Sequence, residues 1–125
     1  MLAGHGTDIV DVGRMRRELD REDGGFCDTV FTDAERDRCS GTRRPEQRFA
    51  ECFAAKEALF KALGTAWQGG LRWREVELEL DARACAQLRL HGAVLQAAAD
   101  AGVRAIHVTV GHSGQLAMAS VLLEA

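Results

Sequence analysis

A long helix, predicted from Pro45 to Leu63, limits what this chain can fold into more than any other segment. Proline suits a first helical position, and Gly64 follows as a typical C-terminal residue. Bulky apolar side chains recur at about 100° per residue and gather on one face. They are Phe49, Cys52, Phe53, Leu59, Phe60 and Leu63, with Ala50, Ala54, Ala55, Ala58 and Ala62 on the other sides. Such a helix buries most of its surface, so we expect it at the centre of the fold.

The remaining segments predict a mixture of strands and shorter helices. Strands are expected at residues 2–10, 71–80 and 88–90, and in a closing hairpin of 105–110 and 116–123 with its turn at 111–114. Asp11 is a good cap for a helix that Gly24-Gly25 ends, and Thr32 with Glu35 forms a capping box for a second. A further helix is expected at 92–101. A length of 125 residues suits one domain, 1–125. We therefore predict an α+β fold with a mixed or antiparallel sheet and a long central helix.

Composition argues against several classes of protein. The net charge of −3 argues against a general nucleic-acid binder. No apolar run approaches the roughly 20 residues that a membrane-spanning helix needs. The N-terminus lacks a basic region followed by an apolar stretch, so we expect a cytoplasmic location without membrane attachment. The four cysteines form no CxxC pair and are expected to be thiols rather than zinc ligands or disulfide partners.

Charged residues within the apolar helix draw attention to chemistry. From Cys52 to Leu63 the only charges are Lys56, Glu57 and Lys61, and Lys56 falls near the middle of the aromatic face. Buried charges are costly unless they are paired or bound to a ligand. Glu57 and Lys61 are four residues apart, which also fits an ordinary helical ion pair worth about 0.2–0.5 kcal/mol. Spacing alone leaves both interpretations open.

Asp8 favours the functional interpretation. It is the only charged residue in the predicted strand that starts the chain, and the composition of this strand suggests burial. Asp8 and Glu57 together would provide two hard oxygen ligands for Mg²⁺, an ion that also accepts phosphate oxygens. Lys61, and with it Lys56, could neutralise the same phosphate.

Two further places suit an anionic ligand. Arg43 and Arg44 precede a helix start, where the positive end of the helix would reinforce them, although a solvated loop explains them slightly better. His112 lies in a glycine-bracketed turn after a strand, a position where side chains often face ligands.

Four motifs, in order along nearly the whole chain, resemble those of holo-acyl-carrier-protein synthases. Gly6-Thr7-Asp8-Ile9 resembles the family's G-x-D-[IV] signature, and Phe31-Thr32-Asp33-Ala34-Glu35 its F-T-x-x-E segment. Residues 53–64, FAAKEALFKALG, are similar to the helix F-A-x-K-E-A-x-x-K-A-[LF]-G. Residues 107–112, HVTVGH, match the closing H-V-[ST]-[LI]-x-H hairpin. The helix motif is the most specific of the four.

The resemblance implies a homotrimer with active sites shared between subunits, which transfers 4′-phosphopantetheine from coenzyme A to a serine of an apo acyl carrier protein. By analogy, Asp8 and Glu57 hold Mg²⁺, and Glu57 or a metal-bound water takes the serine proton. Catalysis would also use Lys61. The implied coenzyme A contacts are Arg43, Arg44, Arg48, Lys56, Lys61, Gly64 and His112. The implied contacts with the acidic carrier helix are Arg14, Arg16 and Arg17.

Three positions depart from the family pattern. Cys52 stands where the family has arginine, and Arg48, one turn earlier, is a possible substitute. The family's G-K-P turn is replaced within Asp81–Ala86, and Gly111 stands where serine or threonine is common. These changes concern the nucleotide end of coenzyme A, so a non-catalytic relative that binds coenzyme A or carrier protein is the alternative. A structural module whose buried charges are merely paired is a third. The carrier could belong to a fatty-acid or a polyketide pathway.

Overall fold

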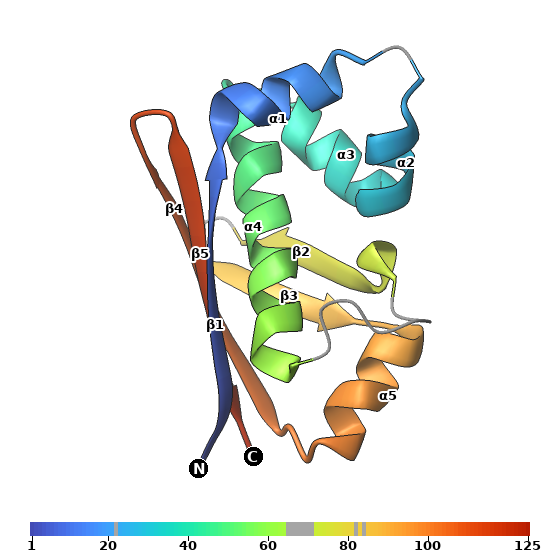
Figure 1. The fold of residues 1–125 in the computed structure, drawn as a ribbon, viewed down its shortest axis with the longest axis vertical. Coiled ribbons are helices and arrows are strands. Elements are labelled where there is room, and N and C mark those ends of the chain that lie inside the picture. Colours follow the sequence, from blue (N-terminus) through green and yellow to red (C-terminus); the bar gives the residue numbers. More distant parts are fainter. Residues whose placement is uncertain (22, 65–71, 82, 84) are drawn as a thin grey trace.

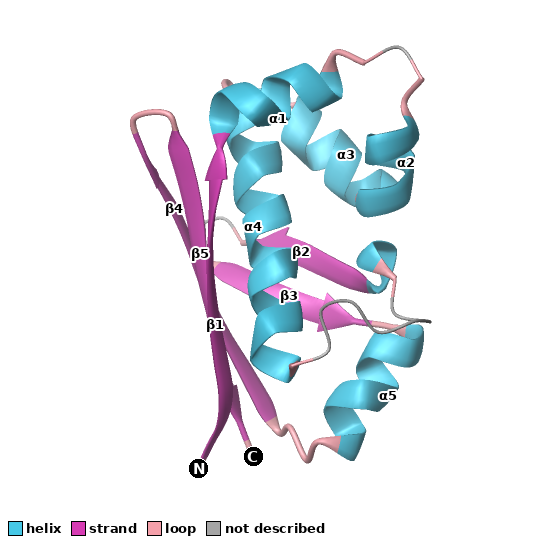
Figure 2. Cartoon of the chain, in the orientation of Figure 1, coloured by secondary structure: helices cyan, strands magenta, loops and turns pink. Residues whose placement is uncertain are grey.

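The computed structural model describes residues 1–21, 23–64, 72–81, 83 and 85–125 (Figures 1 and 2). The helices are α1 (Val12–Leu19), α2 (Gly25–Val30), α3 (Asp33–Ser40), α4 (Pro45–Leu63) and α5 (Gly92–Asp100), with a short 3₁₀ turn at Trp73–Glu75. The strands are β1 (Leu2–Asp11), β2 (Val76–Leu80), β3 (Ala86–Leu90), β4 (Ala105–Ser113) and β5 (Leu116–Glu124). None of the described helices is long and apolar enough to cross a bilayer.

Two antiparallel sheets pack against α4, and they adjoin each other where β3 meets β4. The larger has the strand order β1-β5-β4, and the smaller pairs β2 with β3. Figure 1 shows α4 running along one face of the larger sheet, while the other face of that sheet is uncovered. The predicted α+β class and the long central helix are confirmed, and both sheets are antiparallel.

β1 packs directly against α4 because two of its residues lack side chains. A Cβ added at Gly4 would overlap the carbonyl oxygen of Ala62, and one added at Gly6 would overlap the carbonyl oxygen of Ala58. Backbone meets backbone at this contact, which only glycine permits. The next residue on the same face of β1 is Asp8, so this contact brings its carboxylate to the helix surface.

A buried ion pair joins α4 to α3 and β2. Lys56 is 0% exposed, and its Nζ lies 2.7 Å from Oε1 of Glu35, which is 1% exposed. The same ammonium donates to the carbonyl oxygens of Trp73 and Val76. Glu35 in turn accepts from the backbone N–H groups of Thr32 and Leu78. The predicted capping box of α3 is confirmed, and the capping carboxylate also neutralises the lysine in the core.

Several boundaries differ from the sequence-based expectations. The first helix ends at Leu19, and Gly24, with a left-handed φ of 64°, precedes a helix that was not predicted, α2. β2 begins at Val76, because residues 73–75 form a 3₁₀ turn; position 71 lies outside the described residues. The hairpin turn lies at Gly114, where φ is 58°, so β4 continues to Ser113. β1 is not buried on both faces: its side chains alternate between α4 and the uncovered face.

Breaking the buried ion pair is expected to destabilise the fold strongly. Lys56→Met leaves the carboxylate of Glu35 without its cation and should cost about 3–5 kcal/mol of unfolding free energy in urea titrations. The double variant Lys56→Met/Glu35→Gln removes both charges and should recover part of the loss. A Lys56→Met variant as stable as the wild type would show that the pair contributes nothing.

Candidate active site

Asp8 and Lys61 meet where β1 crosses the last turns of α4. Nζ of Lys61 lies 2.8 Å from Oδ1 of Asp8 and also donates to the carbonyl oxygen of Thr7, at 3.1 Å. The Asp8 side chain is only 12% exposed, whereas that of Lys61 is 48% exposed. The helical ion pair between Glu57 and Lys61 does not form within 4 Å; the lysine instead neutralises the strand carboxylate.

Glu57 is a half-buried carboxylate beside this pair. It makes no hydrogen bond or salt bridge to any residue in the described part of the chain. Burial raises the pKa of the Glu57 carboxyl above its usual range, and the nearby charge of Asp8 raises it further, while Lys61 and Arg14 oppose the change. The two carboxylates therefore form a site in which added positive charge is favourable.

A cavity of about 620 Å³ lies in front of these groups, between β1, α1, α2 and α4. Asp8 and Glu57 line it, and Arg14 projects into it from the first turns of α1. Its apolar walls include Phe26 and Phe53. The cavity thus combines charged side chains with an apolar wall that suits the uncharged part of a ligand.

The other two basic residues of α1 do not line this cavity. Arg16 forms a salt bridge of 3.0 Å with Glu46 at the start of α4, and Arg17 is exposed on the outer side of its helix. Both residues lie within one helical turn of Arg14, which does line the cavity.

Lys56, which we expected to contact coenzyme A, lies in the core instead. Its three donors are used by Glu35 and two backbone carbonyls, and its side chain is fully buried. That expectation was wrong, because Lys56 faces away from Asp8 although it adjoins Glu57 in sequence. From the sequence, Glu35 was assigned only to helix capping. The position of Lys56 on an apolar helix face was the signal that a buried carboxylate must pair with it.

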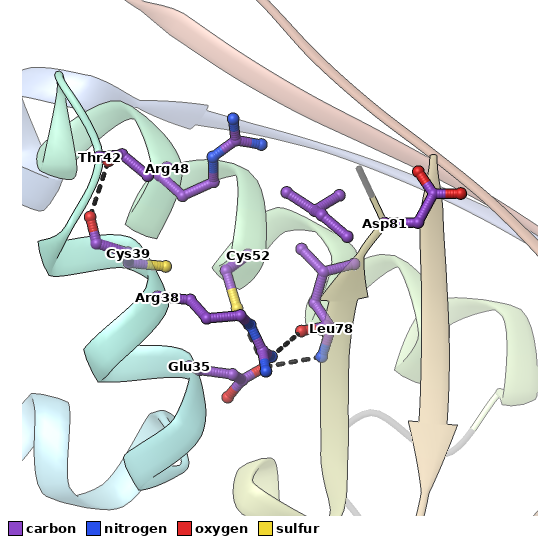
Figure 3. A pocket seen from close by; sticks show the side chains of 9 residues that line it. Glu35, Arg38, Cys39, Thr42, Arg48, Cys52, Leu78 and Asp81 are labelled. Atoms are coloured by element: carbon purple, nitrogen blue, oxygen red, sulfur yellow. Dashed lines mark hydrogen bonds between the residues drawn. The ribbon is translucent and has the colours of Figure 1, made fainter. Parts of the chain in front are cut away.

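The expected coenzyme-binding arginines lie at the other end of α4. Arg43 and Arg44 are exposed in the loop before the helix, and neither forms an ion pair with a described residue. Figure 3 shows that Arg48 lines a second cavity, of about 250 Å³, together with Arg38, Cys39, Cys52 and Asp81. Cys52 donates to Glu35 at 3.1 Å, and burial raises the pKa of its thiol. Arg48 is therefore near the position where the family arginine is replaced.

Gly64 and His112 also lie apart from one another. Gly64 ends α4 with a left-handed φ of 72°, and a Cβ added there would meet no atom of the described residues within 4 Å. His112 extends from β4 toward the first half of α4, where its Nδ1 lies 3.0 Å from Nε2 of Gln47 and 3.9 Å from Oε1 of Glu51. Neither Gln47 nor Glu51 was singled out from the sequence, since both look like ordinary polar helix residues.

The residues around Asp8 fit a hard divalent cation. Both carboxylates offer oxygen ligands, and Glu57 has oxygens without protein partners among the described residues. Burial next to a second carboxylate raises the pKa of Glu57, and a divalent cation between them would remove that repulsion. The described residues contain no cluster of three or more His, Cys, Asp or Glu side chains, so water and ligand oxygens would complete the coordination.

Curated relatives match the chain over its whole length. A holo-[acyl-carrier-protein] synthase of Geotalea daltonii is 38% identical over 124 residues, covering 99% of both chains. A protein of the same name from Koribacter versatilis is also 38% identical, with the same coverage. The sequence model of the 4′-phosphopantetheinyl transferase superfamily matches residues 4–119.

Solved structures give the same result for the fold. The holo-[acyl-carrier-protein] synthase of Neisseria meningitidis aligns over 100% of both chains, with a TM-score of 0.90 and 26% identity. A holo-(acyl-carrier-protein) synthase from Bacillus anthracis, in complex with CoA (3′,5′-ADP), aligns over 98% of this chain and 96% of its own, with a TM-score of 0.80 and 29% identity. The resemblance seen in the motifs is confirmed, and the chain belongs to the holo-acyl-carrier-protein synthase family of the 4′-phosphopantetheinyl transferase superfamily.

Proposed function

We propose that this protein transfers the 4′-phosphopantetheine group of coenzyme A to a serine of an apo acyl carrier protein, with adenosine 3′,5′-bisphosphate as the second product. The observation that carries the proposal is the meeting of Asp8 and Glu57 at one cavity, with Lys61 paired to Asp8. The relatives named for this activity match the chain from end to end, and the altered positions spare all three residues.

Asp8 and Glu57 are the residues that would hold Mg²⁺ against the coenzyme diphosphate. When bound, the ion offsets negative charge on the phosphate oxygens, the main requirement in phosphoryl transfer. Lys61, anchored by Asp8 at 2.8 Å, is placed to contact the same phosphates with its exposed ammonium. The serine hydroxyl attacks the phosphorus nearer to pantetheine, and its proton passes to Glu57 or to a water beside it. Phe26 and Phe53 offer walls for the pantetheine arm.

Carrier recognition is proposed for the basic face of α1. Arg14 lines the cavity mouth and Arg17 is exposed, so both suit the acidic helix of a carrier protein. Arg16 would first have to leave its salt bridge with Glu46.

The positions of the other expected coenzyme-binding residues support a site shared between copies. Arg43, Arg44, Arg48 and His112 do not line the cavity that holds Asp8, although the family resemblance places them all on one coenzyme. A second copy of the protein can bring its own four residues to this cavity. The uncovered sheet face suits such a contact, because it exposes four apolar side chains: Ile9, Leu116, Met118 and Leu122. We propose the homotrimer that the family resemblance implies, assembled through this face.

The transferase proposal is tested by weighing an apo carrier protein after incubation with coenzyme A, Mg²⁺ and the protein. The carrier should gain the mass of phosphopantetheine, and EDTA should prevent the gain. Asp8→Asn and Glu57→Gln should each reduce kcat by at least about 100-fold, because each removes a carboxylate that would hold Mg²⁺ at the transferred phosphate. Asp100→Asn, an exposed residue of α5, is the matched control.

Two results would contradict this assignment. Unchanged rates in Asp8→Asn or Glu57→Gln would exclude the metal-holding role. Tight coenzyme binding without a mass gain, for every carrier protein tried, would favour the non-catalytic relative.

Assembly is tested by light scattering on a size-exclusion column. The wild type should have the mass of three chains, whereas Leu122→Glu should shift it to one and reduce transfer, because the site loses its second half. Leu95→Glu is the matched control: Leu95 is 52% exposed on α5, away from the sheet face, and Leu122 is 44% exposed. A Leu122→Glu variant with the mass of the wild type would show that this face is not the interface.

A further inference from the structure

A buried carboxylate oxygen without a hydrogen-bond partner among the described residues lies beside His112. Glu51, on α4, is 3% exposed, and its Oε1 accepts no hydrogen bond from any residue that the structure describes. One turn earlier, the Oε1 atom of Gln47 is also buried without a partner. Two unsatisfied acceptors this close are unusual, since buried polar atoms are nearly always hydrogen-bonded.

A proton on Nδ1 of His112 can hydrogen-bond one of these side chains and lies close to the other. Its Nδ1 is 3.0 Å from the Gln47 amide nitrogen and 3.9 Å from Oε1 of Glu51. With a bare Nδ1, the ring accepts from the amide, and both oxygens stay unpaired. With a proton on Nδ1, the Gln47 amide turns so that its oxygen accepts, and the positive edge of the ring faces Glu51. Amide orientation and ring tautomer follow from the hydrogen-bond network rather than from atom positions.

We propose that Glu51 and Gln47 are positioning residues that keep the His112 proton on Nδ1 and leave Nε2 for the phosphates of coenzyme A. A carboxylate that fixes the tautomer and direction of an imidazole is a common arrangement in functional sites. The His112 side chain is 49% exposed, and its Nε2 has no partner among the described residues. The phosphate contact rests on the proposed function; the tautomer does not.

Glu51→Gln is the central variant, because it keeps the shape of the side chain and removes its charge. Histidine-labelled ¹⁵N NMR distinguishes the two ring tautomers, and a His112→Gln spectrum identifies the signal among the four histidines. We expect Nδ1–H in the wild type and a shift toward Nε2–H in Glu51→Gln. A wild-type ring with a bare Nδ1, or an unchanged tautomer in Glu51→Gln, would overturn the proposal whether or not the protein is a transferase.

Kinetics add a readout that a purely structural role would not reproduce. In Glu51→Gln the KM for coenzyme A should rise roughly three- to tenfold with kcat within about twofold. Thermal stability should stay equal or increase, because a buried charge has been removed. In a His112→Gln background, Glu51→Gln should have no further effect on KM. An equal KM effect with and without His112 would overturn the proposal. Glu79→Gln, at a half-buried residue of β2 paired with Arg89, controls for loss of charge.

Discussion

The contact between the backbones of β1 and α4 is the constraint on which the rest of the structure depends. Gly4 and Gly6 permit it, because any larger residue at either position would meet the carbonyl oxygens of the helix. The strand is thereby held so close that Asp8 reaches Lys61 and shares its surroundings with Glu57. Asp8 lies on a strand and Glu57 on a helix, far apart in sequence. The site is therefore built on two regular elements rather than on a loop. The site therefore has the rigidity of the fold.

The side of α4 that faces the core carries a buried ion pair that stabilises the fold. Lys56 adjoins Glu57 in sequence but faces Glu35 in the core, so neighbouring charges serve stability and chemistry on opposite sides of the helix. The buried pair fixes the rotation of α4 about its own axis, because every donor of the ammonium has a defined acceptor. That rotation in turn directs Glu57 and Lys61 toward β1. Stability and activity are coupled through the orientation of this helix.

Sequence reasoning located α4 to the residue, because Pro45 and Gly64 are strong boundary signals and the apolar spacing is regular. It also paired Asp8 with Glu57, since a lone carboxylate in an apolar strand needs a cation. It misplaced Lys56, because spacing cannot show that the carboxylate of a capping box also points into the core. Glu51 was missed for a similar reason: its neighbour His112 lies on β4, which follows it by more than fifty residues.

The central claim, that Asp8 and Glu57 form a divalent-metal site, is tested most directly by ¹³C NMR titration of the Glu57 carboxyl. Without metal, its pKa should lie above the usual value of 4.5, because of burial and the charge of Asp8. Ionising Glu57 then weakens the fold, so stability is lost as the pH rises from about 4.5 through the raised pKa. Saturating Mg²⁺ with coenzyme A should lower this pKa below its metal-free value. An identical titration curve with and without Mg²⁺ would contradict the metal site.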